Sequence, residues 1–243
     1  MKLNITKTAE EMGNSAANRA AEVINDCIAK QGHARIVLST GASQFTFLQA
    51  LAEKKVKWSE VEMFHLDEYV SLVDSHPASF RKYLRERFLS YAPVKKAYLV
   101  NGEGDVAVHI AELTAEIDKA PIDLALIGIG ENAHIAFNDP PADFQTTKAY
   151  KIVDLDEACK AQQVREGWFE SLDNVPKQAI TMTVQQILKS AMIISCVPYQ
   201  VKANAIRKTL QDGVDVLIPA SILKTHGNWE LYLDSDSASE IDY

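Results

Sequence analysis

The chain has 243 residues, of which 47% are hydrophobic, and it carries a formal net charge of -8. This length and composition fit one large α/β domain with a sizeable core and differ from those of disordered chains. The negative charge argues against nucleic-acid binding as the main role, and an anionic ligand would need a local cluster of donors. No apolar run reaches the roughly 20 residues of a membrane span, and the N-terminus lacks the charged and apolar regions of a signal peptide. We therefore expect a cytoplasmic protein without nucleic-acid or membrane partners.

Strand-like and helix-like segments alternate along the chain. Apolar residues at helical spacing predict a helix over 9–30, and short apolar runs predict buried strands at 34–39, 61–66 and 122–127. Further strands are expected at 1–6, 97–100, 179–182, 191–197 and 229–233, and further helices at 76–89, 105–119, 184–188, 201–210 and from 218. This alternation predicts a single Rossmann-like domain over 1–243, with a doubly wound, predominantly parallel sheet and helices on both faces. We expect the acidic tail, 234–243, to be frayed.

A small polar loop, Thr40-Gly-Ala-Ser43, follows a buried-type strand and precedes an apolar-periodic helix. Backbone N–H groups, the hydroxyls of Thr40 and Ser43 and the helix N-terminus would all favour a phosphate. The loop lacks the Gly-Lys-Ser/Thr ending of a Walker loop. Because such loops often simply cap helices, the loop alone leaves both interpretations open.

The strand expected at 122–127 is continuously apolar from Leu124 to Ile127, as in a strand covered on both faces. Two glycines then break it, and a dense polar group follows: Glu131, Asn132, His134, Asn138 and Asp139. In open α/β sheets, ligands bind beyond the carboxyl ends of the strands. A lone histidine is more often packed or capping, but the glycines, the strand end and the carboxylates coincide here. We therefore interpret this stretch as part of a functional site.

Two further segments bear on that site. Asp67 and Glu68 follow the strand over 61–66, where they are either solvated or include a base held in a cleft. A long polar stretch after Pro140-Pro141 leads into a helix that carries Cys159 to Arg165. Since long segments beside a site often act as lids, we expect a lid around 141–170.

The three cysteines, Cys27, Cys159 and Cys196, are widely spaced. This spacing fits neither a disulfide framework nor a zinc site, and no histidine spacing suggests a metal. We expect no cofactor.

Together these motifs resemble the glucosamine-6-phosphate deaminase/isomerase family, whose wider superfamily includes the 6-phosphogluconolactonases. The resemblance covers nearly the whole chain, in the family's order. The blocks that carry it are Ser39-Thr-Gly-Ala-Ser43, Phe64-His-Leu-Asp-Glu-Tyr-Val70, His76-Pro-Ala-Ser-Phe80, Gly128-Ile-Gly-Glu-Asn-Ala-His-Ile-Ala-Phe-Asn-Asp-Pro140, Val175-Pro-Lys-Gln-Ala-Ile-Thr181 and Pro219-Ala-Ser-Ile-Leu-Lys-Thr-His226.

The resemblance implies isomerisation of an amino-sugar phosphate to the ketose phosphate with release of ammonia. Asp67 matches the base that moves a proton between C2 and C1, and His134 matches the residue that assists ring opening. Asn132 and Asp139 occupy the places of the two carboxylates that polarise the histidine. The groups that match phosphate ligands are Thr40, Gly41, Ala42, Ser43 and Lys202. The family's lid arginine has no clean match: Gly167 falls near its place, and Arg165 is the closest candidate.

Several departures from the family pattern matter. Asn132 can orient the imidazole through a hydrogen bond but cannot stabilise its protonated form by charge, and Asp139 is one methylene shorter than the usual Glu. Asn before the histidine and the Ile218-Pro-Ala-Ser221 block also occur in the galactosamine-6-phosphate isomerase branch. Glucosamine-6-phosphate and galactosamine-6-phosphate therefore both stay open as substrates. Ala142 and Ala149 fall where allosteric deaminases hold an activator, so we expect no such activation and a monomer or small homo-oligomer.

Two alternative functions stay open. A 6-phosphogluconolactonase-type hydrolase would use His134 to activate water, but the Leu-Asp-Glu-Tyr block and the Asn-Asp-Pro ending argue against it. A sugar-phosphate-binding regulator with weakened catalysis would explain Asn132 and the missing arginine. Release of ammonia, release of acid, or binding without turnover would separate the three.

Overall fold

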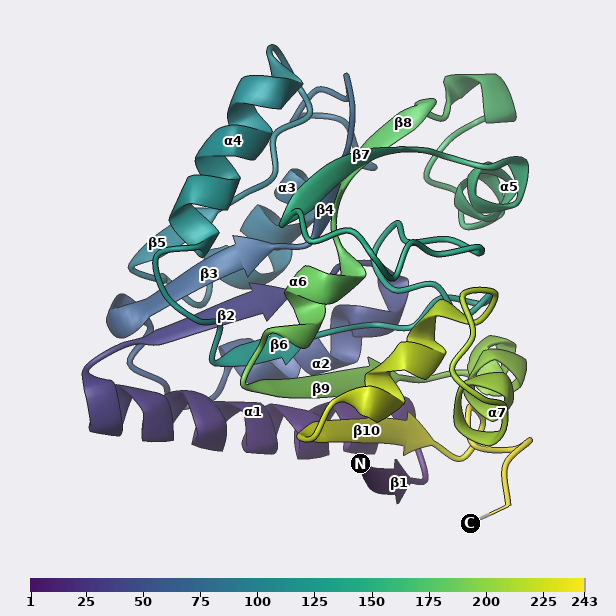
Figure 1. The fold of residues 1–243 in the computed structure, drawn as a ribbon. Helices are drawn as coiled ribbons and strands as arrows, with labels where there is room; N and C mark the ends of the chain where they lie inside the picture. Colours follow the sequence, from purple (N-terminus) through teal and green to yellow (C-terminus); the bar gives the residue numbers. More distant parts are fainter. Residues whose placement is uncertain (243) are drawn as a thin grey trace.

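The computed structural model describes residues 1–242, and its centre is a sheet of seven parallel strands (Figure 1). The strands lie in the order β1-β10-β9-β6-β2-β3-β5. Their bounds are β1 (Lys2–Thr6), β2 (Ala34–Leu38), β3 (Val61–His65), β5 (Lys96–Tyr98), β6 (Leu124–Leu126), β9 (Met192–Val197) and β10 (Trp229–Asp234). The chain builds the sheet outward from β2 through β3 to β5, then returns to the other side of β2 with β6. The prediction of a predominantly parallel sheet is confirmed.

Helices cover both faces of this sheet, as predicted. One face packs on α1 (Ala9–Gln31), α2 (Phe45–Ala52), α3 (Phe80–Leu84) and the π-helical turn Arg85–Leu89. The other packs on α4 (Val106–Ile117), α6 (Val184–Leu188), α7 (Ala203–Gln211) and the 3-10 helix Pro219–Thr225. Successive strand residues face opposite cores, so Ile36 lies in the first core and Val37 in the second. This is why the central strands are apolar at most positions on both faces, without a regular alternation of apolar and polar residues.

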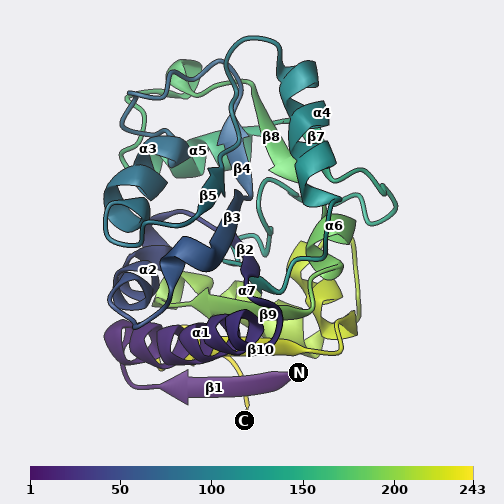
Figure 2. The same cartoon turned by 90° about the vertical axis from the view of Figure 1, so that its left-hand side faces the viewer.

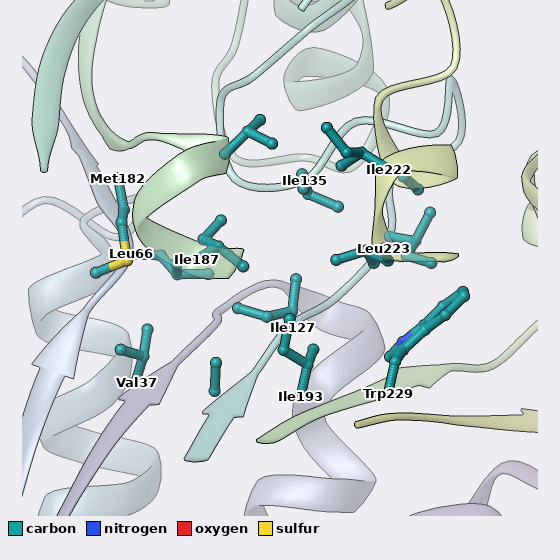
Figure 3. Packing of buried hydrophobic residues seen from close by; sticks show 14 of the residues in the cluster. Val37, Leu66, Ile127, Ile135, Met182, Ile187, Ile193, Ile222, Leu223 and Trp229 are labelled. Carbon is teal, nitrogen blue, oxygen red and sulfur yellow. The ribbon is translucent and has the colours of Figure 1, made fainter. Parts of the chain in front are cut away.

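The core between β9, β6 and the second helical layer is closely packed (Figure 3). Ile127, Ile193 and Trp229 lie at its centre and are at most 1% exposed. Trp229 also donates an indole hydrogen bond to the Ser195 hydroxyl at 3.1 Å, so its one polar atom is satisfied.

A second, antiparallel sheet of three strands was not predicted from the sequence. It consists of β4 (Asp67–Tyr69), β8 (Gln178–Met182) and β7 (Tyr150–Asp154), in that order. Figure 2 shows it at the end of the molecule opposite α1 and β1. Tyr69, which is fully buried, packs on Phe80, Phe137 and Phe169 with ring centroids 5.2, 5.3 and 5.5 Å away. This aromatic cluster joins the small sheet to α3 and to the segment after α5 (Glu157–Arg165).

The expected lid around 141–170 therefore includes a strand, β7, that is hydrogen-bonded along its length to β8. The rest of that segment consists of loops and of α5, whose N-cap Asp156 accepts a bond from the Cys159 backbone N–H at 2.6 Å. Movement of this segment as a lid stays a prediction.

Two sequence expectations were wrong. The helix expected from residue 76 begins at Phe80, with Ser79 as its N-cap. Its Arg81 is 4% exposed, because Glu68, Leu72 and Asn101 accept bonds from its guanidinium. The tail is not frayed at its start. Asp234 is 3% exposed and accepts bonds from the backbone N–H groups of Tyr199 and Ser237. Within residues 1–242, every helix is too short or too polar to cross a membrane.

Truncating Ile193 to alanine should lower the free energy of unfolding by about 2–5 kcal/mol, because it leaves a cavity in a core that cannot collapse around it. The same change at Ile152, which is 43% exposed, should cost less than about 1 kcal/mol. Urea unfolding of both variants measures the difference. Equal losses at the two positions would contradict the packing described.

Candidate active site

The candidate site lies at the carboxyl edge of the parallel sheet, where β2 and β6 are neighbours but the chain leaves them in opposite directions. Such a switch point opens a crevice in doubly wound folds. A cavity of about 280 Å³ occupies it. Its walls come from the loops after β2, β6 and β9, from Asp67 in β4, and from α5 with the turn that follows it.

The loop after β2 forms one end of the cavity, and all four residues from Thr40 to Ser43 line it. Gln44 anchors this loop: its side-chain amide, which is 1% exposed, donates to the Cys196 carbonyl at 3.0 Å and to the Ser43 hydroxyl at 3.2 Å. Tyr83 donates its phenol hydrogen to the Gly41 carbonyl at 3.0 Å. Gly41 has φ of 102°, a conformation that favours glycine. The loop is thus held rigid with its polar groups toward the cavity.

Lys202 brings a buried cation to the same end. It lies in the short 3-10 helix Gln200–Lys202 after β9, lines the cavity and is 7% exposed. Burial lowers the pKa of this lysine, while Glu131 and Glu166 act in the opposite direction. No carboxylate of residues 1–242 forms an ion pair with it. A buried ammonium without a counter-ion is suited to an anion, so this end of the cavity fits a phosphate.

His134 lies at the base of the cavity and is oriented by two side chains. Its Nδ1 lies 2.6 Å from the Asn132 Oδ1 and 3.2 Å from the Asp139 Oδ1. Asn132 in turn donates its amide to the Asp139 carboxylate at 3.1 Å. Because both neighbours of Nδ1 are acceptors, that nitrogen carries the proton, which leaves the Nε2 lone pair free. Although burial acts against it, hydrogen bonds from His134 and Asn132 hold the pKa of Asp139 below its usual value.

The backbone around His134 explains the two small residues that precede it. A Cβ atom on Gly130 would overlap the imidazole ring of His134. Ala133 has φ of 66°, in the left-handed region, and its N–H closes a tight turn onto the Gly130 carbonyl at 3.1 Å. The chain therefore turns back at once after β6 and lays the histidine over Gly130.

Asp67 faces the same cavity from β4 and is 6% exposed. Burial, and then the neighbouring Glu68 carboxylate, raise its pKa to about 8. Glu68 is fully buried and accepts bonds from the Ser79 hydroxyl at 2.8 Å and from the backbone and side chain of Arg81. Of the two interpretations of this acidic pair, the structure thus places Asp67 in a cleft and Glu68 in a buried ion pair. A carboxyl group with a pKa near neutrality is suited to general acid–base chemistry.

The structure thus brings nearly all predicted site residues together. Asn132 and Asp139 lie behind His134, and Thr40, Gly41, Ala42, Ser43, Asp67, His134 and Lys202 line one cavity. Arg165 is the exception: it lies at the edge, 60% exposed, with its guanidinium 2.7 Å from Glu131. Its role as a phosphate ligand stays a prediction.

Sequence reasoning missed the wall that α5 contributes. The side of the cavity opposite Asp67 and His134 is lined by Gln162, Gln163, Glu166 and Trp168. The available signal was a polar helix with bulky amide side chains beside a predicted site. No cluster of three or more His, Cys, Asp or Glu side chains in residues 1–242 is arranged to hold a metal.

Comparison with known proteins defines the class. Residues 7–231 match the family described as glucosamine-6-phosphate isomerases/6-phosphogluconolactonase. The chain belongs to this family of sugar-phosphate enzymes, as the sequence motifs predicted.

Individual relatives show which members of the family the chain is similar to. The chain is 33% identical to a glucosamine-6-phosphate deaminase of Streptococcus uberis, with 100% of both chains covered. It is 34% identical to that of Streptococcus pyogenes serotype M1, over 92% of this chain and 94% of the relative. A solved structure of a monomeric glucosamine-6-phosphate deaminase superposes with a TM-score of 0.90 at 29% identity, covering 99% of this chain and 100% of that one. A putative 6-phosphogluconolactonase of Neisseria gonorrhoeae shares the fold, with a TM-score of 0.78 at 18% identity over 96% and 99% of the two chains.

Replacing Gly130 by alanine should lower sugar-phosphate turnover by about 100-fold, because the new methyl group displaces the His134 ring by an ångström or more. The fold should persist, since only a side chain has to move. Gly213→Ala, where a Cβ meets no neighbour, is the control and should leave turnover unchanged. Steady-state kinetics and a crystal structure of the variant test this. Normal turnover by a Gly130→Ala enzyme in which the ring is displaced would show that His134 takes no part in the reaction.

Proposed function

We propose that this protein is an amino-sugar phosphate isomerase/deaminase. It converts glucosamine-6-phosphate, or its C4 epimer galactosamine-6-phosphate, to the ketose 6-phosphate and ammonia. The observation that carries the proposal is that one cavity combines an anion-binding end with two proton-transfer groups. The anion-binding end, formed by Thr40 to Ser43 and Lys202, would take the phosphate. Asp67 and His134 would then meet the other end of the sugar.

The assigned roles follow from the chemistry of the reaction. The free Nε2 of His134 is suited to exchange a proton with the ring oxygen or the anomeric hydroxyl, which opens the sugar ring. The ionised Asp67 carboxylate removes the proton from C2 and returns it to C1. The product of that transfer is an imine at C2, which water hydrolyses to the ketose and ammonia. A single carboxylate that reaches two adjacent carbons suffices for the transfer.

Asn132 is neutral, so only one of the two side chains that contact His134 Nδ1 is a carboxylate. The imidazolium that forms during ring opening is stabilised by one carboxylate, Asp139, and by a neutral amide oxygen. A charged hydrogen bond is worth about 1–2 kcal/mol more than a neutral one, so ring opening should be slower than with two carboxylates. The chain compensates in part by placing the Asn132 amide on Asp139, which fixes the whole unit.

Phosphate binding would rest first on the loop after β2 and on Lys202. Arg165 would join them only by leaving Glu131, its partner at 2.7 Å. Exposed ion pairs of this kind are worth at most about 1 kcal/mol, so a phosphate dianion could compete for the arginine. The monomeric form of the related deaminase supports a monomer as the working state.

The purified protein should release ammonia from glucosamine-6-phosphate, galactosamine-6-phosphate or both, and Asp67→Asn should abolish that release. Burial keeps Asp67 protonated in the folded state up to a pH of about 8, whereas the unfolded chain ionises near its ordinary value of 3.8. Ionisation therefore destabilises the fold as the pH rises through this window. The asparagine variant should be more stable than the wild type at pH 9, by about 1–3 kcal/mol.

Ammonia is measured by a coupled assay and stability by urea unfolding. Full activity of Asp67→Asn would refute the role of the base. Acid release from a sugar lactone phosphate without ammonia release would favour the hydrolase instead, and binding without either product would favour the regulator.

The pH profile should report the buried carboxyl group. Since the base must be ionised, kcat/KM should rise with pH and level off above an apparent pKa of about 8 in the free enzyme. Glu68→Gln removes the adjacent negative charge and should move the rise in kcat/KM to lower pH. Asp118→Asn, a surface change at the end of α4, should leave the profile in place. If kcat/KM of the wild type already levelled off below pH 5, Asp67 would not be the titrating group.

A further inference from the structure

The wall of α5 contains a side-chain amide that faces the cavity and has no partner in the described part of the protein. Gln163 is 8% exposed and lines the cavity. Its backbone carbonyl accepts a bond from the Trp168 N–H at 3.0 Å, but no side chain or backbone group of residues 1–242 bonds to its side-chain amide. The Gln163 amide therefore has a donor and an acceptor available to whatever fills the cavity.

The position of Gln163 along α5 indicates which part of a ligand it meets. One turn earlier, the Cys159 thiol lies beside the Asp139 carboxylate, which is paired with His134. Three residues later, Glu166 acts on Lys202 at the anion-binding end. Residues three and four apart lie on one face of a helix, about 5–6 Å from each other. Gln163 thus faces the middle of the cavity, between the proton-transfer end and the anion-binding end.

The neighbours of Gln163 keep this part of the wall fixed. Glu166 accepts bonds from the Gln162 amide at 2.7 Å and from the Trp168 indole at 3.1 Å. Both donors are neutral, and no lysine, arginine or histidine of residues 1–242 forms an ion pair with Glu166. The helix end is therefore tied down by side chains that do not use the Gln163 amide. A rigid amide flanked by a fixed carboxylate is suited to bind hydroxyl groups.

We propose that Gln163 is a specificity-determining residue whose side-chain amide binds a hydroxyl group on the central carbons, C3 or C4, of the open-chain hexose phosphate. The inference rests on the proposed function, and it adds the residue that reads the sugar between the phosphate and the reacting carbons. A ligand hydroxyl can both donate to the amide oxygen and accept from the amide nitrogen. A bound sugar that lacks the hydroxyl would enclose the amide without giving it a partner, which is the strongest basis for rejecting an analogue.

The test compares the wild type with Gln163→Met, which keeps the length of the side chain and removes its polar atoms. Ammonia release is measured from glucosamine-6-phosphate and from its 3-deoxy and 4-deoxy analogues. The substitution should lower kcat/KM for the parent sugar by about 10–100-fold. For the analogue that lacks the bound hydroxyl, the loss should be less than about 3-fold, because the contact is already absent. The matched control is Gln178→Met, an exposed glutamine that bonds to Asp154, and it should change none of the three.

Thermal unfolding separates binding from folding. Gln163→Met should unfold at the same or a higher temperature than the wild type, because no hydrogen bond within residues 1–242 is lost. Equal losses of kcat/KM on all three sugars, or a loss below 3-fold on the parent, would overturn the proposal. A wild type that releases no ammonia would refute the proposed function instead. Calorimetric binding of the same three sugar phosphates to both proteins would then decide the role of Gln163 by the same pattern of losses.

Discussion

The arrangement of the site depends on one contact, that of His134 Nδ1 with Asp139 and Asn132. It fixes the tautomer, and therefore decides which nitrogen faces the cavity. The contact exists only because Gly130 lacks the Cβ that would occupy the position of the ring, and because Ala133 accepts a left-handed backbone. These two small residues thus allow the chain after a buried strand to turn and hold the imidazole in place. The adjacent strands supply the other groups, because parallel strands present their carboxyl ends at one edge.

A second constraint is the treatment of charge in β4. Two adjacent carboxyl groups point to opposite sides of the strand, and the protein gives them opposite environments. Glu68 is surrounded by donors from the start of α3, including Arg81. Asp67 faces the cavity and lacks such donors within residues 1–242, so burial raises its pKa to about 8. The ionised Glu68 adds to this shift, which links the base to the ion pair that holds β4 against α3. A carboxyl group whose pKa is raised by burial is a common way to build a base that works near neutral pH.

The sequence predicts the parts of the molecule whose cause is local. Periodicity identifies α1 and the buried strands, since burial on both faces produces apolar runs such as that of β6. It does not identify β4, which has three residues and owes its existence to pairing with β8. The same holds for the tail, where Asp234 is ordered by the backbone of Tyr199, 35 residues away. Site residues on loops after strands could be predicted because the fold class places them there. Gln163 could not, because its exposure to the cavity depends on how α5 lies over the sheet.

The charge balance around Lys202 unites these features. An anion approaching a chain with a net charge of -8 is repelled at long range, so affinity must come from donors inside the cavity. Two carboxylates near Lys202 could cancel its charge, but each is engaged elsewhere: Glu131 with Arg165, and Glu166 with the Gln162 amide and the Trp168 indole. The lysine is thereby kept buried and without a counter-ion. An occupied cavity would restore its balance, because a phosphate supplies the missing negative charge where the loop after β2 supplies hydrogen-bond donors. The α5 wall would thus favour anion binding without touching the anion, because Glu166 bonds to neutral donors instead of forming an ion pair with the lysine.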